Sequence, residues 1–296
     1  MAVIEITPTG NIIGATVRGI SLQNIPVGQP IEALEDALEH YGVLIFPNQQ
    51  NVTPAEQIAF SQVFGSLEVV DVPHALLPGY PEIFVVGNTG KKLVTFSPAE
   101  PDGELEWHTD SIHQDPVARA SLLLAREIPK TGGDTLFACM YSAYDSLDAE
   151  TRSLCDTLDV VNSVSAVESY IERQDHAGMH QGDLGEIASS TTIRPLVRAH
   201  PRTGRRALYF GNQVSVGIVG WPEEKAQNFI AWLTEHAWRD AFQYCHKWHT
   251  GDAVFWDNRR VLHAGTPYDI TNSRRQMHRT TISETIQVQP ANTEIQ

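Results

Sequence analysis

The sequence predicts a mainly β fold with helical additions, either a β-sandwich or a jelly roll. Short apolar segments of strand character recur along the chain, and only a few segments have helical spacing. The two kinds of segment do not alternate regularly, as they would in a doubly wound parallel sheet. Because no internal repeat or linker stands out, we expect one domain over residues 1–296.

Local signals define the elements near the start of the chain. Residues 31–41 carry apolar side chains at helical spacing and predict a helix. The run VLIF at 43–46 predicts a buried strand. Thr53 followed by Pro54 is typical of a helix start, and this helix is expected to reach about Phe64.

The remaining elements are mostly strands. Residues 118–127 (ARASLLLARE), with the apolar stretch LLLA at 122–125, predict a central strand. An amphipathic helix is expected at 223–238. Further strands are expected at 82–87, 207–210, 253–257 and 280–288.

Two segments contain long irregular stretches. One is near 68–105, where residues 88–106 are rich in Gly, Pro, Lys and Glu and lack a hydrophobic period, and the other is near 165–195, which is polar and irregular. Long irregular segments within a compact domain are usually functional lids or disordered, so we expect both to be mobile.

Composition limits the classes of partner and the compartment. The chain has 21 basic and 36 acidic residues and a formal net charge of −15, which argues against a nucleic acid partner. No apolar run is long enough to span a bilayer, and no signal peptide is evident at the start. Cys139, Cys155 and Cys245 are an odd set without C-x-x-C spacing, which favours reduced thiols in the cytoplasm. A homo-oligomer is one assembly that the sequence allows.

The acidic balance makes a local group of arginines informative. Arg274, Arg275 and Arg279 gather near the end of the chain. Arg275 and Arg279 share a face on a strand, and two inward arginines would be costly without anions to pair with. Arg274 has the opposite parity and is expected at the surface. The alternative is a solvated basic strand edge without a ligand.

Two H-x-D pairs could supply metal ligands. Non-haem iron(II) oxygenases use two histidines and one carboxylate on one face of the metal. His108 and Asp110 form one pair, and His113 and Asp115 form the other. Side chains two residues apart on a strand point to the same side. Asp115 precedes Pro116, which favours a turn there and therefore the first pair. A polar strand end without metal is the alternative for each.

The third ligand must come from elsewhere in the chain. His263 follows the predicted strand 253–257 and is one candidate, and His278 is another. His246 and His249 would share a face if they were helical and could bind zinc, but the Glu of zinc peptidases is absent between them.

Five motifs follow one another along the chain: WHTD at 107–110, TGGDT at 131–135, WDNR at 256–259, VLH at 261–263 and RQMHR at 275–279. In this order they resemble a known family, that of taurine dioxygenase and 2,4-dichlorophenoxyacetate dioxygenase. The similarity covers nearly the whole chain, from about Gly14 to Thr285, and WDNRRVLHAGTPYDI is especially similar to the phenoxyacetate branch.

The resemblance implies a double-stranded β-helix, or jelly roll, with iron at its open end. It implies that His108, Asp110 and His263 bind Fe(II) and that Thr135 and Arg275 hold the distal carboxylate of 2-oxoglutarate. An arginine suits this carboxylate because it can bind it in a bidentate way, and a threonine hydroxyl can donate a further hydrogen bond.

The resemblance also implies the reaction class and one substrate contact. Arg279 matches the arginine that binds an acidic group of the substrate. The expected activity consumes 2-oxoglutarate and O2, oxidises an unactivated C–H of a small anionic substrate (a carboxylate or sulfonate), and releases succinate and CO2. Asp257 and Asn258 are interpreted as turn formers that position His263.

Several alternatives stay open from the sequence alone. The same cofactor chemistry could end in desaturation, epimerisation or ring formation. A zinc hydrolase and a non-catalytic jelly-roll binding protein are further readings. Val70 stands where the taurine branch has a histidine that holds the sulfonate, and Glu104 stands where the taurine enzyme has an asparagine. These departures make taurine doubtful as the substrate.

Overall fold

A computed structural model of the chain describes residues 4–24, 27–70, 72–89, 97–98, 102–103, 105–166, 169 and 191–284. Its largest element is an eight-stranded sheet, with antiparallel neighbours except for β2 and β3. In spatial order its strands are β1 (Glu5–Pro8), β2 (Ala15–Arg18), β3 (Val43–Phe46), β14 (Ala253–Asp257), β6 (Ala118–Glu127), β16 (Gln276–Ser283), β5 (Tyr80–Gly87) and β4 (Leu76–Leu77).

Smaller sheets complete the β structure. The one that matters most for the site is three-stranded, with β7 (Thr135–Cys139) between β13 (Gln243–His246) and β15 (Val261–Gly265). The others are β12 (Ser215–Ile218), β8 (Asp159–Ser163) and β9 (Thr191–Pro195), and the pair β10 (Val197–Ala199) and β11 (Arg206–Leu208). This mainly β arrangement with few helices is the expected jelly roll.

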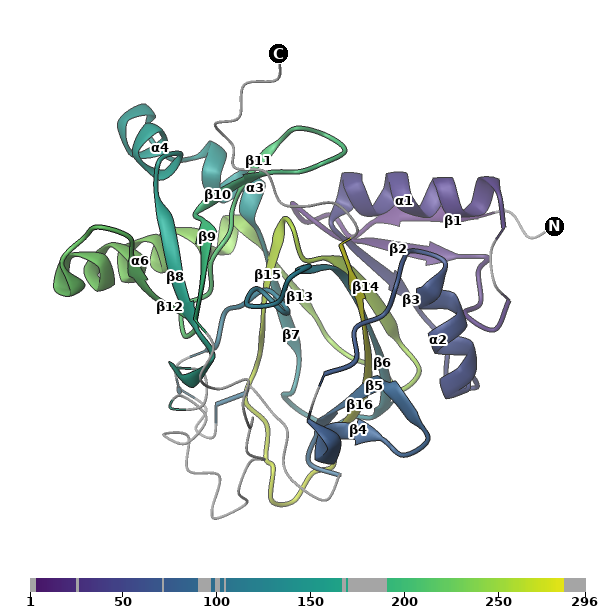
Figure 1. Ribbon diagram of the computed structural model, residues 1–296. Coiled ribbons are helices and arrows are strands. Elements are labelled where there is room, and N and C mark those ends of the chain that lie inside the picture. The colour runs from purple at the N-terminus through teal and green to yellow at the C-terminus, as the bar shows by residue number, and fades with distance from the viewer. Residues whose placement is uncertain are drawn as a thin grey trace.

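The helices lie outside the sheets (Figure 1). α1 (Gln29–Tyr41) and α2 (Pro54–Gln62) cover one face of the eight-stranded sheet, where α1 contacts β3 and β14 and α2 contacts β5 and β16. The others are α3 (Met140–Asp145), α4 (Ala149–Cys155), α6 (Glu223–Ala237) and the short turns η1 (Pro73–Ala75) and η3 (Asp240–Phe242). None of the helices in the described ranges is both long and apolar enough to cross a bilayer.

Strand β6 explains why the large sheet is buried on both faces. Leu122 and Leu124 pack into the core beneath α1 and α2. Leu123 and Ala125, which point the other way, pack into the core shared with β7 and β15. The apolar stretch LLLA at 122–125 is therefore the consequence of two cores, one on each side of the sheet.

Most sequence-based elements are confirmed with small shifts. Helices α1, α2 and α6, strands β3, β6 and β14, and the Thr53 N-cap with its reciprocal Glu56 contact were all expected. The expected strand 280–288 begins earlier, as β16, and the part from 285 onwards lies outside the described residues. The expected strand 207–210 is β11, and 82–87 is β5.

The two segments that were expected to be irregular fall partly outside the described residues. Within 68–105, the expected strand 82–87 is present as β5, and η1 and β4 are regular as well. Within 165–195, the last five residues form β9, so the expectation of irregular structure is wrong there. The strands β4 and β9 are ordered by pairing with β5 and β8, which the local sequence does not reveal.

Candidate metal centre and adjoining cavities

His108 and His263 are joined through their backbones. The amide of His108 donates to the carbonyl of His263 at 3.0 Å, and the amide of His263 donates to the carbonyl of His108 at 2.8 Å. His263 lies in β15, whose pairing with β7 places it opposite Phe137. The two imidazole rings consequently lie side by side, with centroids 4.1 Å apart.

Asp110 faces both rings. Its Oδ1 lies 3.9 Å from Nε2 of His108 and 3.9 Å from Nε2 of His263. Its Oδ2 accepts a hydrogen bond of 2.6 Å from Ser121 on β6. One ligand atom from each of the three candidate residues lies within 4.8 Å of the others. The structure therefore brings together the three residues that the sequence singled out for iron.

Asn258 positions the Asp110 segment. Its side-chain oxygen accepts a hydrogen bond from the Asp110 amide at 3.3 Å, and its amide nitrogen donates to the Ser121 hydroxyl at 2.9 Å. Its backbone carbonyl accepts a hydrogen bond of 2.7 Å from the Thr109 hydroxyl. In these contacts Asn258 supports Asp110, whereas its place in the sequence had predicted a turn that positions His263.

Asp257 anchors the same turn from the side away from the metal centre. It is fully buried and accepts two hydrogen bonds from the Arg259 guanidinium, at 2.8 and 2.6 Å. Nε2 of His200 lies 3.0 Å from Oδ2 of Asp257. Burial alone would raise the pKa of Asp257, but Arg259 and His200 hold it well below its usual range. The carboxylate therefore stays charged and keeps the turn fixed.

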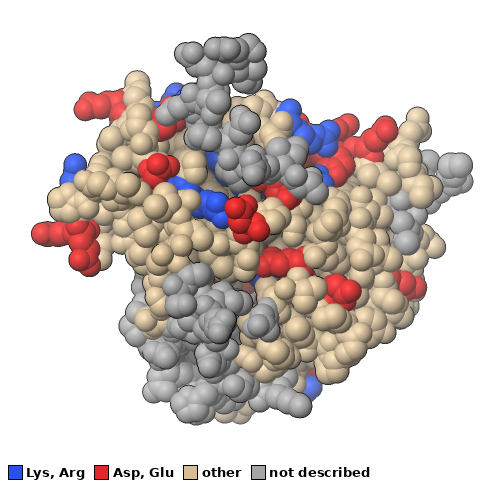
Figure 2. Space-filling view, viewed as in Figure 1, with Lys and Arg blue, Asp and Glu red and all other residues tan. Residues whose placement is uncertain are grey.

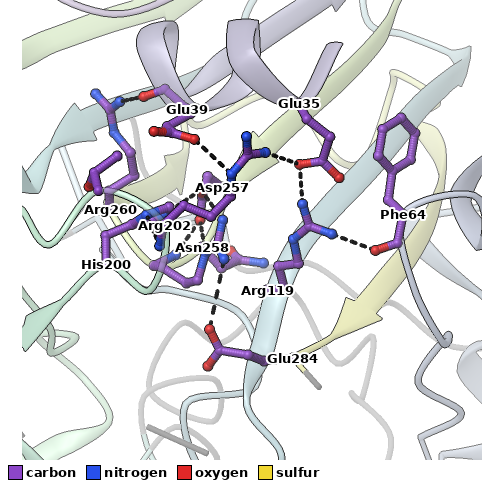
Figure 3. Close-up of polar contacts among 12 residues, drawn as sticks. Glu35, Glu39, Phe64, Arg119, His200, Arg202, Asp257, Asn258, Arg260 and Glu284 are labelled. Atoms are coloured by element: carbon purple, nitrogen blue, oxygen red, sulfur yellow. Dashed lines mark hydrogen bonds and ion pairs between the residues drawn. The ribbon is translucent and has the colours of Figure 1, made fainter. Parts of the chain in front are cut away.

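A charged network continues from this turn to α1 (Figure 3). Arg119 of β6 pairs with Glu35 of α1 and donates to the Phe64 carbonyl at 2.5 Å. Arg260 donates to the Glu39 carbonyl in the same helix. The turn that supports Asp110 is thus held between the sheet and α1.

The electrostatics of the three candidate ligands suit a cation. Burial raises the pKa of Asp110, but Arg279, His263 and His108 outweigh it and lower the value to about 2. Burial, followed by the neighbouring His108, moves the pKa of His263 well below its usual range. One carboxylate and two imidazole nitrogens, with His263 neutral, form a donor set that fits Fe(II).

The other candidate ligands lie elsewhere. His113 lines a cavity beside the centre, but neither it nor Asp115 belongs to the ligand cluster, which is the one such group in the described part of the chain. His246 ends strand β13 and His249 lies beyond it, so the helical zinc pair is ruled out. His278 faces Arg126 in a different part of the large sheet.

A cavity of about 50 Å³, here called the Thr135 cavity, adjoins the metal centre. It lies between the two sheets, because its lining comes from β6 and β16 on one side and from β7 and β15 on the other. Its lining residues are Val86, Ser97, His108, Leu123, Thr135, Trp256, His263, Gly265, Arg275 and Arg279.

Arg275 makes the Thr135 cavity suitable for an anion. Its side chain is buried, and its Nε donates to the Gly133 carbonyl at 3.2 Å. Within the described residues no carboxylate lies within ion-pair distance of it. A buried guanidinium without a counter-charge is unfavourable, so the site fits the distal carboxylate of 2-oxoglutarate. The indole N–H of Trp248 donates to the Thr135 hydroxyl at 3.0 Å, which leaves the hydroxyl hydrogen for a ligand.

Gly133 allows Arg275 to approach. It has φ +68°, and a Cβ there would lie 2.8 Å from Cγ of Pro129 and 3.3 Å from Cδ of Arg275. A side chain at residue 133 would therefore both strain the backbone and displace the guanidinium stem. This explains one glycine of the TGGDT motif.

A second cavity, of about 130 Å³ and here called the Ile112 cavity, opens on the other side of His108 and Arg279. Its apolar lining is Val70, Val72, Phe84, Ile112, Val164 and Val214. Arg279, on β16, contacts Asp110 and lies over the Phe84 ring at 4.9 Å. Arg274 instead pairs with Glu127 at the surface, as its parity predicted.

Two residues of the centre were not found from the sequence. Ser121 comes from β6, and only the pairing of β6 with β14 and β16 brings it to Asp110. Glu106 is 2% exposed and lines the Ile112 cavity, and burial raises the pKa of its carboxyl to about 7. Its spacing of two from His108 was a signal that could have identified it.

Comparison with known proteins gives a consistent result. The family model described as "Taurine catabolism dioxygenase TauD, TfdA family" matches residues 4–281. The (S)-phenoxypropionate/alpha-ketoglutarate-dioxygenase of Delftia acidovorans is 32% identical over 284 residues, covering 93% of this chain and 94% of the relative. The alpha-ketoglutarate-dependent 2,4-dichlorophenoxyacetate dioxygenase of Cupriavidus pinatubonensis is 31% identical, covering 94% and 98%.

A solved structure agrees with both relatives. The crystal structure of AAD-2 in complex with Mn(II) and N-oxalylglycine has a TM-score of 0.79 and 29% identity, and the match covers 96% of this chain and 98% of that one. The zinc hydrolase and silent binding protein readings are therefore set aside. The chain belongs to the TauD, TfdA family and is an Fe(II)- and 2-oxoglutarate-dependent dioxygenase that uses O2.

Proposed function

We propose that the enzyme oxidises an unactivated C–H bond of a small carboxylate or sulfonate that binds in the Ile112 cavity. The observation that carries this proposal is the position of Arg279, which lines both cavities beside the three candidate ligands. Arg275 serves the Thr135 cavity alone. Each cavity thus has an arginine for one acid, as a reaction with an acidic co-substrate and an acidic substrate requires.

Each site residue has a distinct task in this proposal. His108, Asp110 and His263 hold Fe(II), which with 2-oxoglutarate and O2 supplies the oxidising chemistry. Arg275 and Thr135 bind and orient the distal carboxylate of 2-oxoglutarate. The protein's share of catalysis is positioning and electrostatics.

Arg279 fixes the substrate relative to the metal centre. Its guanidinium binds the acidic group of the substrate, while the valines, Ile112 and Phe84 surround an apolar body and exclude water. The two curated relatives are named for carboxylic acids, phenoxypropionate and 2,4-dichlorophenoxyacetate, which supports this class. Val70 lines the cavity where the taurine branch has a histidine, so taurine remains a poor candidate; Glu104 lies outside the described residues.

A substrate screen with two arginine variants tests the proposal. Carboxylates, aryloxyalkanoates and sulfonates are assayed for coupled release of succinate. Arg279→Ala should raise the KM for the substrate at least tenfold more than the KM for 2-oxoglutarate, and Arg275→Ala should do the reverse. If both variants raised the KM values of both ligands equally, Arg279 would not be specific for the substrate and Arg275 would not be specific for 2-oxoglutarate.

The same assay identifies the outcome of the reaction. Product analysis by mass distinguishes hydroxylation from desaturation and ring formation, which remove two hydrogens. Hydroxylation adds one oxygen or, at a carbon that bears an ether or sulfonate, splits the product into a carbonyl compound and a leaving group. Epimerisation leaves the mass unchanged and is detected by chiral chromatography. Hydroxylation is the outcome that we propose.

The net charge and the free cysteines support the class of partner and the cytoplasmic location that we propose. On the face in Figure 2, Lys and Arg side chains of the described residues lie close to acidic ones, and the net charge is −15, which argues against a nucleic acid partner. All three cysteines are free, which is consistent with the cytoplasm. We also propose that residues 1–296 form a single domain. Size-exclusion chromatography with light scattering would show whether the protein forms a homo-oligomer.

A further inference from the structure

Glu106 lies on the same side of the chain as the candidate metal ligands. His108 pairs with His263 in an extended conformation, and side chains two residues apart on extended backbone point the same way. Glu106, His108 and Asp110 therefore follow one another along one face. Oε2 of Glu106 lies 3.7 Å from Nδ1 of His108, and the residue lines the Ile112 cavity.

The carboxyl of Glu106 is not needed to support His108. Nδ1 of His108 is 3.0 Å from the backbone carbonyl of Glu106, a hydrogen bond that fixes the tautomer and leaves Nε2 toward Asp110. The carboxyl oxygen is farther away than a hydrogen bond allows. The backbone of residue 106 thus orients the imidazole, and its side chain is left for another task.

Two side chains that line the Ile112 cavity have unsatisfied polar atoms. In the described part of the chain, Oε2 of Glu106 and Nε of Arg279 have no hydrogen-bond partner, although both atoms are buried. Polar neighbours on the same wall are satisfied internally: Thr109 donates to Asn258, and Ser111 donates to Glu68. Leaving a buried acceptor and a buried donor unsatisfied is costly, so a ligand that supplies both partners is favoured.

We propose that Glu106 is a specificity-determining residue, and that the substrate is a small acid that also carries an N–H or O–H donor. This inference rests on the proposed function, since it takes Arg279 as the site for the acidic group. Arg279 binds the acid, Glu106 accepts a hydrogen bond from a hydroxyl or ammonium group, and the apolar wall encloses the carbon skeleton between them. An acid of the same skeleton without the donor leaves Glu106 buried and unpaired.

Matched acids test this recognition. Butanoate, pentanoate and phenoxyacetate are compared for coupled succinate release with their hydroxy and amino derivatives, substituted at each carbon of the alkyl chain in the first two acids and at each ring carbon in phenoxyacetate. For the wild type, the kcat/KM of the best donor-bearing acid should exceed that of its parent roughly tenfold or more, since the parent acid leaves the buried oxygen of Glu106 without a hydrogen bond. Glu106→Leu should bring the ratio close to one.

Two further variants make the test specific. Val72→Ala changes the shape of the same cavity without removing a polar group, and it should keep the wild-type ratio. Glu106→Gln keeps the size and an acceptor oxygen but not the charge. It should retain the preference for a hydroxy acid and lose the preference for an amino acid, which identifies the donor. Thermal melting and binding of 2-oxoglutarate with Mn(II) verify that each variant is folded.

The results separate failure of this inference from failure of the proposed function. Equal conversion of parent and donor-bearing acids by the wild type would overturn the inference and leave the proposed function intact. If Glu106 acts only through His108, Glu106→Leu lowers kcat/KM for every acid by one factor and the ratio persists, which also overturns it. If no acid of either kind releases succinate, the proposed function falls and this inference falls with it.

Discussion

Ser121 and Asp110 form a hydrogen bond of 2.6 Å that joins the large sheet to the metal centre. The hydroxyl of Ser121 donates to Oδ2 of the Asp110 carboxylate, and Oδ1 faces both imidazole rings. Asn258 in turn donates to the Ser121 hydroxyl, so that the serine is itself held in place. The orientation of the proposed carboxylate ligand is therefore set by the protein before a metal binds.

Ser121→Ala should weaken Fe(II) binding roughly 10- to 100-fold, as removal of a partner of a metal ligand generally does. The affinity is measured anaerobically by competition with a chelator. Asp110→Ala serves as the reference and should abolish 2-oxoglutarate-dependent succinate formation. An unchanged Fe(II) affinity in Ser121→Ala would show that the carboxylate is oriented by other contacts, and full turnover by Asp110→Ala would end the ligand assignment.

Gly133→Ala should weaken 2-oxoglutarate binding about tenfold, because it adds strain of roughly 1–3 kcal/mol at a positive φ and crowds Arg275. Gly204→Ala is a matched control, since Gly204 also has φ +68° but has nothing within 4 Å of an added Cβ. Binding is measured by calorimetry with Mn(II) in place of Fe(II). The explanation is wrong if both alanine variants lose affinity equally, or if neither does.

Trp248→Phe should lower the affinity for 2-oxoglutarate by roughly three- to tenfold, which corresponds to about 1 kcal/mol for one lost hydrogen bond. The indole N–H fixes the Thr135 hydroxyl so that its hydrogen points to the ligand. Trp232→Phe, an exposed position on α6, is the control and should bind normally. A normal affinity in Trp248→Phe would mean that Thr135 is oriented without the indole.

His278 should make stability fall in mild acid. Burial, followed by the charge of Arg126, lowers the pKa of His278 to about 4 from an ordinary 6.5. The unfolded chain then binds the proton more readily than the folded protein does. The stabilisation is complete above pH 6.5 and is lost as the pH falls toward 4, by roughly 1–2 kcal/mol between pH 7 and 5.

Urea unfolding at pH 7 and 5 measures this loss. His278→Gln cannot take up the proton and should reduce the difference between the two pH values. His249→Gln, whose side chain is 85% exposed in the wild type, should retain it. If His278→Gln shows the wild-type difference, other groups are responsible for the acid sensitivity.

The parts of the site that could be predicted were those set by local sequence. Alternation along an extended chain was enough to place His108 and Asp110 on one side and to separate Arg274 from Arg275, although it pairs His113 with Asp115 equally well. The choice of His263 over three other histidines came from the resemblance to a family, because the β7–β15 pairing that places it is a long-range contact.

What could not be predicted depends on sheet register. Ser121 reaches Asp110 because β6 lies between β14 and β16, and no local signal gives that order. Asn258 was recognised as a turn residue, but its hydrogen bonds to Asp110 and Ser121 join residues that are 148 and 137 positions apart. The strand character of β9 was missed for the same reason, since its polar sequence is ordered by pairing with β8.

The contact between Arg279 and Asp110 has a consequence for protein engineering. A new acid preference is often sought by replacing the residue that recognises the acid, but here that change would remove the nearest positive charge from a proposed iron ligand as well. Libraries directed at Val72, Val164 and Val214 would reshape the chamber while leaving the oxidising centre undisturbed. Selectivity for the carbon skeleton of the acid is therefore best altered through these three valines.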